Sequence, residues 1–146
     1  MSATYLVTGG MGCIGAWTLY HLVQQGKKAV NFDISEDRHR LDWLMDADEQ
    51  EAITFVKGDL TNTEQVKAVV AEQGITHIIH LGALQVPMCR ANPVLGANVN
   101  VTGTINIFEA AKAANLGHVV YASSIAVYGP AEEYPEGLLA HDAPKA

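Results

Sequence analysis

An apolar run followed by a loop of glycines constrains this chain more than any other feature. Residues 5–7, Tyr-Leu-Val, precede the sequence TGGMGCIG at 8–15, and an amphipathic stretch follows at 16–25. Strand, glycine turn and helix in this order are the context that a dinucleotide-binding fingerprint requires. Side chains at the glycines would collide with a pyrophosphate or with the packed strand, and the helix N-terminus offers free N–H groups to the phosphates.

Short apolar runs rich in β-branched residues alternate with amphipathic stretches along the rest of the chain. We expect strands at Thr4–Thr8, Ala29–Asp33, Ile53–Lys57, His77–Leu81 and His118–Ala122. We expect helices at Gly12–Gln25, Ser35–Ala47, Thr63–Gln73 and Pro93–Asn115. With right-handed crossovers, this alternation predicts an α/β fold: a Rossmann-type doubly wound parallel sheet of about five strands in the order 3-2-1-4-5.

Helix ends and a change of composition set the expected boundaries. Gly26, Gly74 and Gly117 stand just beyond helix ends, where C-cap glycines belong. Residues 61–64, Thr-Asn-Thr-Glu, have the spacing of a capping box. We therefore expect a dinucleotide-binding domain over 1–128 and a loop-like tail, rich in proline and acids, over 129–146.

Composition excludes several classes of function. The net charge is −7 and no basic run occurs, so nucleic acid and anionic membranes are poor partners. No stretch has transmembrane length and no secretion signal opens the chain. The two cysteines, Cys13 and Cys89, form no disulfide framework, which suits a reducing cytoplasm. The histidines have no metal-ligand spacing, so we expect no structural metal.

Asp33 is the first of four further features that suit a dinucleotide. It ends the second expected strand, where a carboxylate accepts hydrogen bonds from both hydroxyls of the adenosine ribose. It would repel a 2′-phosphate, which favours NAD over NADP. Arg38 is the opposing signal, since an arginine nearby accommodates that phosphate; its plainer interpretation is a solvated helix residue.

Two further features follow the third and fourth strands. Asp59 can accept from the adenine amino group while Leu60 packs on the ring, although Asp59 also suits a loop acid or a helix N-cap. The sequence His-Leu-Gly-Ala at 80–83 lets the backbone approach a cofactor closely. For His80 itself, a hydrogen-bonded core histidine is the better explanation than a catalytic one.

The fourth feature lies inside the last expected helix, at 98–104. Gly103 and the β-branched residues around it are poor helix formers, which suggests close packing against the central strand. Asn100 would then face the cofactor or the loops of the active site. For Gly103 and Thr104, packing is as good an explanation as cofactor contact.

Together these motifs resemble the extended short-chain dehydrogenase/reductase family, in its NAD-dependent epimerase/dehydratase branch. TGGMGCIG matches the family's glycine loop, Gly58-Asp59-Leu60 its adenine motif, 80–83 its HxAA, 100–104 its NVxGT and 121–129 its SS-x-x-VYG. The resemblance covers essentially the whole chain. The resemblance, together with the spacing of the motifs, implies that the following residues bind NAD: Gly9, Gly12, Cys13, Ile14, Gly15, Asp33, Asp59, Leu60, Leu81, Gly82, Ala83, Asn100 and Ser123.

The resemblance also implies a chemistry on nucleotide sugars. The serine matching Ser124 hydrogen-bonds the hydroxyl that is oxidised, and a tyrosine with a lysine four residues later acts as the base. No tyrosine of these 146 residues is followed by lysine at that spacing. We therefore expect a truncated NAD-binding part of an epimerase/dehydratase-type oxidoreductase, inactive alone, without the C-terminal substrate lobe. Where the family often has serine, Cys89 stands, which leaves the substrate open.

Other interpretations of the same motifs remain. The chain could be a non-catalytic module that senses NAD or binds a protein, or a partial reading frame. The resemblance further implies that the fifth strand becomes a sheet edge beside uncovered apolar surface. Open edges and apolar patches favour self-association, so we expect a homo-oligomer.

Overall fold

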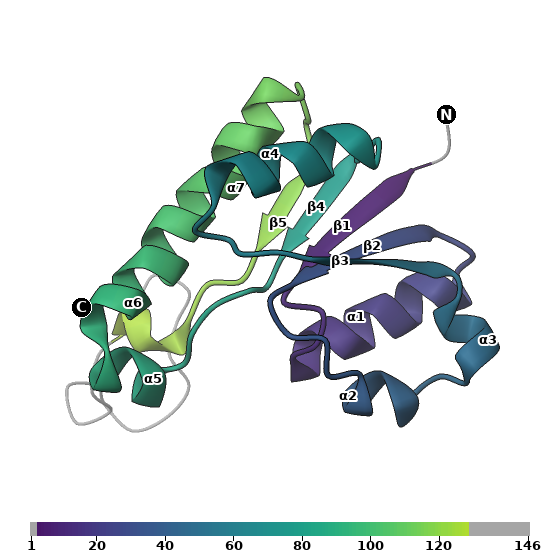
Figure 1. Ribbon diagram of the computed structural model, residues 1–146, viewed down its shortest axis with the longest axis horizontal. Helices are drawn as coiled ribbons and strands as arrows, with labels where there is room; N and C mark the ends of the chain where they lie inside the picture. Colours follow the sequence, from purple (N-terminus) through teal and green to yellow (C-terminus); the bar gives the residue numbers. More distant parts are fainter. Residues whose placement is uncertain (1–2, 129–146) are drawn as a thin grey trace.

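Five parallel strands form one sheet in the order β3-β2-β1-β4-β5, as predicted (Figure 1). The computed structural model describes residues 3–128. The strands are β1 (Thr4–Thr8), β2 (Lys28–Asp33), β3 (Ile53–Lys57), β4 (His77–His80) and β5 (Val119–Tyr121). Strand order reverses at β1, which pairs with β2 on one side and β4 on the other. A crevice for a ligand is expected at the carboxyl ends of the strands at such a switch point.

Helices cover both faces of the sheet, with α4 and α7 on one side and α1 on the other (Figure 1). The α-helices are α1 (Cys13–Gln24), α2 (His39–Asp42), α3 (Ala47–Gln50), α4 (Thr63–Glu72), α5 (Val86–Ala91), α6 (Pro93–Ala97) and α7 (Gly103–Ala113). A π-helical turn, η1 (Asn98–Thr102), joins α6 to α7, and a 3-10 turn, η2 (Ile125–Tyr128), follows β5.

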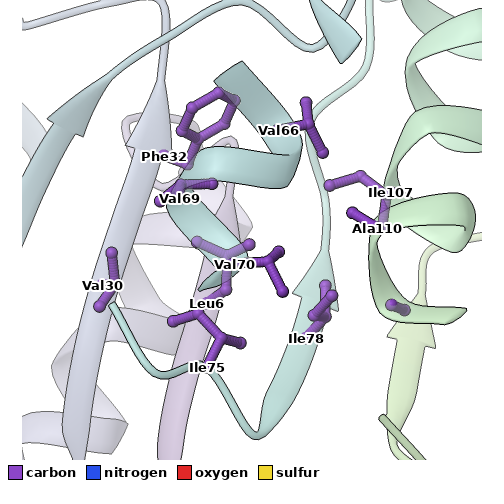
Figure 2. Packing of buried hydrophobic residues seen from close by; sticks show 11 residues of the cluster. Leu6, Val30, Phe32, Val66, Val69, Val70, Ile75, Ile78, Ile107 and Ala110 are labelled. Carbon is purple, nitrogen blue, oxygen red and sulfur yellow. The ribbon is translucent and has the colours of Figure 1, made fainter. Parts of the chain in front are cut away.

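Each face of the sheet has its own apolar core, because successive strand side chains point to opposite sides. Figure 2 shows Leu6, Val30 and Ile78 of the strands facing the valines of α4 and Ile107 and Ala110 of α7. On the opposite face, Val7 and Ala29 pack with Leu19 of α1. The strands β1 and β4 thereby lie between two layers of helix.

The prediction of one helix over Ser35–Ala47 was wrong. The segment instead contains the short helix α2, and a second short helix, α3, begins at the last residue of the predicted one. Short polar side chains keep the first residues out of a helix: the Ser35 hydroxyl accepts from Asp37 N–H at 3.2 Å, and Asp37 Oδ1 accepts from His39 N–H at 3.1 Å. Such local bonds compete with a helix ladder. Asp46 then caps α3 through a reciprocal capping box with Glu49.

The helix predicted over Pro93–Asn115 is present in extent but not regular. The π turn interrupts it, and the N–H of Gly103 reaches back five residues to the Asn98 carbonyl. Sequence reasoning also missed α5, whose signal was the proline at its first turn. Pro87 lies between the fourth expected strand and the last expected helix, where no element was predicted.

Several predicted ends differ by one or two residues. Strand β4 ends at His80 rather than Leu81, and β5 spans Val119–Tyr121 rather than His118–Ala122. Gly26 and Gly74 take positive φ after their helices, as predicted, whereas after α7 Asn115 does so in place of Gly117. Asn62, not Thr61, caps α4. The predicted tail, 129–146, lies outside the described residues.

Candidate cofactor-binding site

The glycine loop passes against the end of β4 so closely that side chains have no room. Gly9 has φ +71°, and a Cβ on it would lie 2.7 Å from the Cα of Gly82. A Cβ on Gly15 would overlap the carbonyl oxygen of Gly9 and lie 2.6 Å from the Cα of Gly10. The loop is closed by the N–H of Gly12, which donates to the Gly9 carbonyl at 3.0 Å. Glycine at positions 9 and 15 therefore lets the loop pack directly against the end of β4 and the start of α1.

Two adjoining cavities open over the carboxyl ends of the strands, with volumes of about 560 and about 1000 Å³. Both are lined by Gly9, Gly12 and residues 81–84, so they form one groove across the switch point. The smaller cavity also contains Asp33, Asp59 and Leu60. The larger also contains Cys13, Ile14, Gly15, Asn100, Ser123 and Ser124. The structure thus brings all the sequence-predicted site residues to one groove.

The Asp33 carboxylate is oriented by the backbone around it. Its Oδ2 accepts the N–H of Met11 at 3.0 Å, and its Oδ1 accepts the N–H of Ser35 at 2.9 Å. Each oxygen keeps acceptor capacity, since an ionised carboxylate has about four lone-pair sites. The side chain is half-buried at the end of β2 and can still accept from two hydroxyls.

Arg40, not Arg38, is the arginine of this cavity. Arg38 lies with its guanidinium carbon 3.6 Å from the ring centroid of Phe55 and lines a separate hollow beside α3. Arg40 Nη1 donates to the carbonyl of Met11 at 3.2 Å, and the side chain lines the smaller cavity with Asp33. Sequence reasoning missed Arg40 because the segment was taken as one helix, in which its direction could not be judged.

Asp59 and Leu60 line the smaller cavity together with the glycine loop. Asp59 Oδ1 accepts from the N–H of Thr61 at 2.8 Å and from its hydroxyl at 2.9 Å, so the carboxylate also fixes the turn before α4. A Cβ on Gly82 would lie 2.7 Å from Leu60 Cδ1, and one on Gly103 would lie 3.0 Å from Leu60 Cβ. Gly103 therefore serves packing, which was one of the two interpretations of this residue.

A chain of hydrogen bonds links the glycine loop to α7 through His80. Thr8 Oγ1 accepts from the N–H of Leu81 at 3.2 Å and of Gly82 at 3.1 Å, so its own proton is directed to His80 Nδ1, 2.7 Å away. His80 Nε2 must then carry the ring proton and donates to Thr104 Oγ1 at 3.0 Å. His80 is a hydrogen-bonded core histidine, and burial lowers the pKa of its imidazole below the ordinary value.

Asn100 holds the loop that leads to α5. Its Oδ1 accepts from the N–H of Leu84 at 2.7 Å, and its Nδ2 donates to the carbonyl of the same residue at 2.9 Å. The Thr104 hydroxyl donates to the Asn100 carbonyl at 2.7 Å, within the π turn. Of the two predicted orientations, the side chain takes the one towards the loops. Cys89 lies beside it, with Asn100 Nδ2 3.5 Å from Sγ.

Ser123, Ser124 and Cys13 lie on the side of the groove away from Asp33. Both serines are exposed after β5, and Ser124 Oγ accepts the N–H of Ala126 at 3.2 Å at the start of η2. Its hydroxyl proton is free to donate towards the groove. Cys13 is an exposed free thiol at the first residue of α1. Within residues 3–128, no group of three or more His, Cys, Asp or Glu side chains could hold a metal.

Comparison with known proteins agrees with this geometry. The sequence profile described as GDP-mannose 4,6 dehydratase matches residues 6–141, which is nearly the whole chain. The chain belongs to the GDP-mannose 4,6 dehydratase family. Among its relatives is the UDP-glucose 4-epimerase of Klebsiella pneumoniae, 31% identical, with 89% of this chain and 95% of that sequence covered. The bifunctional UDP-glucose 4-epimerase and UDP-xylose 4-epimerase 3 of Arabidopsis thaliana is 34% identical over 89% of this chain.

Solved structures extend the comparison to the fold. The UDP-glucose 4-epimerase of Thermus thermophilus, in complex with NAD, has a TM-score of 0.82 at 29% identity and covers 98% of this chain. This member of the GDP-mannose 4,6 dehydratase family spans 44% of the Thermus chain and 39% of the Arabidopsis protein. Among residues 3–128, no helix is both long and apolar enough to cross a bilayer.

Proposed function

We propose that this chain binds NAD and forms the cofactor half of an oxidoreductase site acting on a nucleotide sugar, of the epimerase or dehydratase type. The observation that carries the proposal is the glycine loop before α1, whose backbone packs so closely that a Cβ on Gly9 or Gly15 would overlap neighbouring backbone atoms. The loop lines the same groove as an oriented carboxylate, Asp33. The relatives named for epimerisation of UDP-sugars support the substrate class.

The residues present fit a dinucleotide along the whole groove. The N–H groups of the first turn of α1 and the positive end of its dipole would hold the pyrophosphate at Gly12, Cys13 and Ile14. Asp33 would accept both ribose hydroxyls, and Asp59 and Leu60 would bind the adenine. Leu81, Gly82 and Ala83 would line the path towards Ser123 and Asn100 in the larger cavity.

The chemistry that NAD supplies when bound is acceptance of a hydride from a carbinol carbon. Ser124 would position that carbinol, because its hydroxyl is exposed at the groove and can hydrogen-bond the substrate oxygen. The polar chain from Thr8 through His80 would keep the loop end of β4 in place below the groove. No Tyr-x-x-x-Lys occurs among the 146 residues, so we propose that this polypeptide by itself binds NAD without turnover.

A second candidate function is a module that senses NAD or binds a protein. Val120 and Tyr121, which are exposed on β5, would belong to its protein-binding surface. The two functions predict the same cofactor affinity and differ in what else is needed: a sugar nucleotide for the first, a protein partner for the second. Saturation-transfer NMR with UDP-glucose, in the presence of NAD, separates them, since only the first requires sugar-nucleotide binding to the cofactor complex.

The setting of the proposed function is the cytoplasm, in a homo-oligomer. The two cysteines are unpaired, which suits a reducing compartment. Strand β5 is the last strand of the sheet, and Val120 and Tyr121 on it are exposed. Apolar residues on an open edge are a template for pairing with another chain.

Titration calorimetry of the 146-residue chain with NAD tests the central proposal. We expect one site per chain and tighter binding of NAD than of NADP. Gly15→Ala, which would overlap the Gly9 carbonyl, should abolish the heat of binding. Gly117→Ala is the matched control, since a Cβ there meets nothing within 4 Å. Absence of binding by the unaltered chain, with its melting curve cooperative, would contradict the proposal.

A further inference from the structure

The charged side chains of the groove are separated by sign between its two cavities. The smaller cavity contains three carboxylates beside one arginine: Asp33, Asp37, Asp59 and Arg40. Among residues 3–128, no carboxylate lines the larger cavity, which contains Ser124, and Arg90 is the single cation on its wall. His80 also lines this cavity, but burial holds its pKa below the ordinary value, so its ring is neutral. The end of the groove at Ser124 therefore carries one positive charge, in a chain whose net charge is −7.

The guanidinium of Arg90 is unpaired. Arg90 lies in the last turn of α5 and is exposed. Within the part of the chain that the structure describes, no carboxylate lies within 4.0 Å of its nitrogens and no side chain or carbonyl accepts a hydrogen bond from it. A guanidinium carries five N–H donors in a planar fork, a geometry that matches the two oxygens of a carboxylate. All five donors of Arg90 are therefore available to a molecule in the larger cavity.

The backbone that carries Arg90 is held in place at the cavity wall. Asn100 binds both polar backbone groups of Leu84, at 2.7 and 2.9 Å, in the loop that leads into α5. Cys89, the residue before Arg90, packs against the next helix so closely that a Cβ on Gly96 would lie 2.9 Å from its Sγ. The side chain of Arg90 thus extends from a fixed point, and its direction along the cavity wall does not depend on a mobile loop.

We propose that Arg90 binds a carboxylate on the sugar of the substrate, so that the substrate is the nucleotide derivative of a sugar acid. The inference rests on the proposed function, because it places the reacting sugar at Ser124. Arg90 and Ser124 line the same cavity, so one sugar ring can present its carbinol to the serine and its carboxylate to the guanidinium. Two parallel N–H···O bonds from an arginine fix the orientation of a carboxylate, and with it the ring that carries it.

The diphosphate of a sugar nucleotide is the other anion of such a substrate. Both of its phosphates are ionised, and one guanidinium balances only one of these charges. Because no second cation of residues 3–128 lines the larger cavity, the charge of Arg90 matches a carboxylate better than a diphosphate. A cation in the last turn of a helix also suits the helix dipole, but α5 has only six residues and the effect at an exposed end is small. That role predicts a change in stability without a change in ligand affinity.

The experiment compares the dissociation constants of UDP-glucuronate and UDP-glucose, which differ only in the carboxylate on the sugar, by titration calorimetry in saturating NAD. The variants are Arg90→Gln and Arg90→Lys, with Arg38→Gln as the control for an arginine outside the groove. We expect the unaltered chain to bind UDP-glucuronate about tenfold more tightly, the lower end of the range for a charge-assisted hydrogen bond, because Arg90 is exposed. Arg90→Gln should abolish the preference and leave UDP-glucose unchanged. Arg90→Lys should retain part of the preference, and Arg38→Gln all of it.

The outcomes separate the inference from the function on which it rests. Absence of NAD binding by the folded chain, or of binding of either sugar nucleotide to its NAD complex, overturns both. Equal affinity of the unaltered chain for the two sugar nucleotides overturns the inference alone. So does a preference for UDP-glucuronate that persists in Arg90→Gln, whatever the melting temperature of that variant. An equal loss of both ligands in Arg90→Gln overturns it as well, because the guanidinium would then bind the diphosphate that both ligands share.

Discussion

The hydroxyl of Thr8 and Nδ1 of His80 lie 2.7 Å apart, and this hydrogen bond joins the strand before the glycine loop to its neighbour. Because the hydroxyl already accepts two backbone N–H groups, the imidazole must accept its proton. A protonated ring would lose that acceptor and place two donors face to face. The neutral ring is therefore part of the folded structure, and its protonation opposes folding.

We predict that stability falls as the pH is lowered through the ordinary histidine range. Burial lowers the pKa of His80 below its ordinary value of 6.5, so the unfolded chain takes up the proton first. The contribution of the neutral ring is complete above pH 6.5 and is lost progressively below it. Urea unfolding between pH 5 and 8 measures this slope, which should be flatter in His80→Gln. An equal slope in His80→Gln and in His21→Gln, the exposed control, would refute the assignment.

Gly15→Ala tests the contact between the glycine loop and α1. The new Cβ would lie 2.6 Å from the Cα of Gly10, and backbone on both sides prevents relief. We expect a loss of about 1–3 kcal/mol in the free energy of unfolding, the usual cost of overpacking. Chemical denaturation measures it, with Gly117→Ala unchanged beside it. A stability equal to the control would mean that the loop has another conformation.

Asn100→Ala tests the bridge from the π turn to the loop after β4. The substitution leaves the N–H and the carbonyl of Leu84 without their side-chain partner, at 2.7 and 2.9 Å. We expect a loss of about 1–3 kcal/mol, as for other half-buried groups deprived of a partner. Hydrogen exchange should show a faster amide at Leu84. Asn98→Ala, at an exposed position of the same turn, should leave that amide unchanged; equal effects of both would contradict the bridge.

Val120→Glu tests self-association at the edge of the sheet. Val120 is 64% exposed on β5, where a carboxylate would interrupt pairing with a second copy. Light scattering after size exclusion should show an oligomer for the unaltered chain and a smaller species for Val120→Glu. Thr54→Glu places the same charge on an exposed position of β3, the opposite edge, and should leave the oligomer intact. A monomeric unaltered chain would overturn this prediction.

The sequence predicted the sheet order and the groove because both follow from periodicity and from glycine. Asp33 and residues 80–83 end strands, and the ends of parallel strands meet at one edge, so their convergence needs no tertiary detail. Arg38 and Arg40 show the limit of that reasoning. Both are cations within a few residues of Asp33, and only the break of the expected helix at 35–38 directs one to Phe55 and the other to the Met11 carbonyl.

For His80, the sequence favoured a hydrogen-bonded core histidine over a catalytic one, and the structure confirms that role. The partners of the ring could not be predicted. Its partners, Thr8 and Thr104, lie 72 and 24 residues away and come together only when β1 and α7 flank β4. Asn100 was predicted to face either a cofactor or a loop. Its side chain bonds Leu84 in the loop that leads to α5, and the periodicity of the sequence did not reveal that helix.

The π turn at Asn98–Thr102 sets the rotation of α7 about the helix axis relative to α6. Each residue of an α-helix advances the direction of its side chains by about 100°. If the same residues formed a regular α-helix, everything after the turn would be rotated by about that angle relative to α6. Asn106, which donates to the Leu60 carbonyl at 2.9 Å, and Ile107, which is fully buried in the core, would then face elsewhere. The turn absorbs one residue, so that α6 contacts α5 while α7 remains seated on α4 and the sheet.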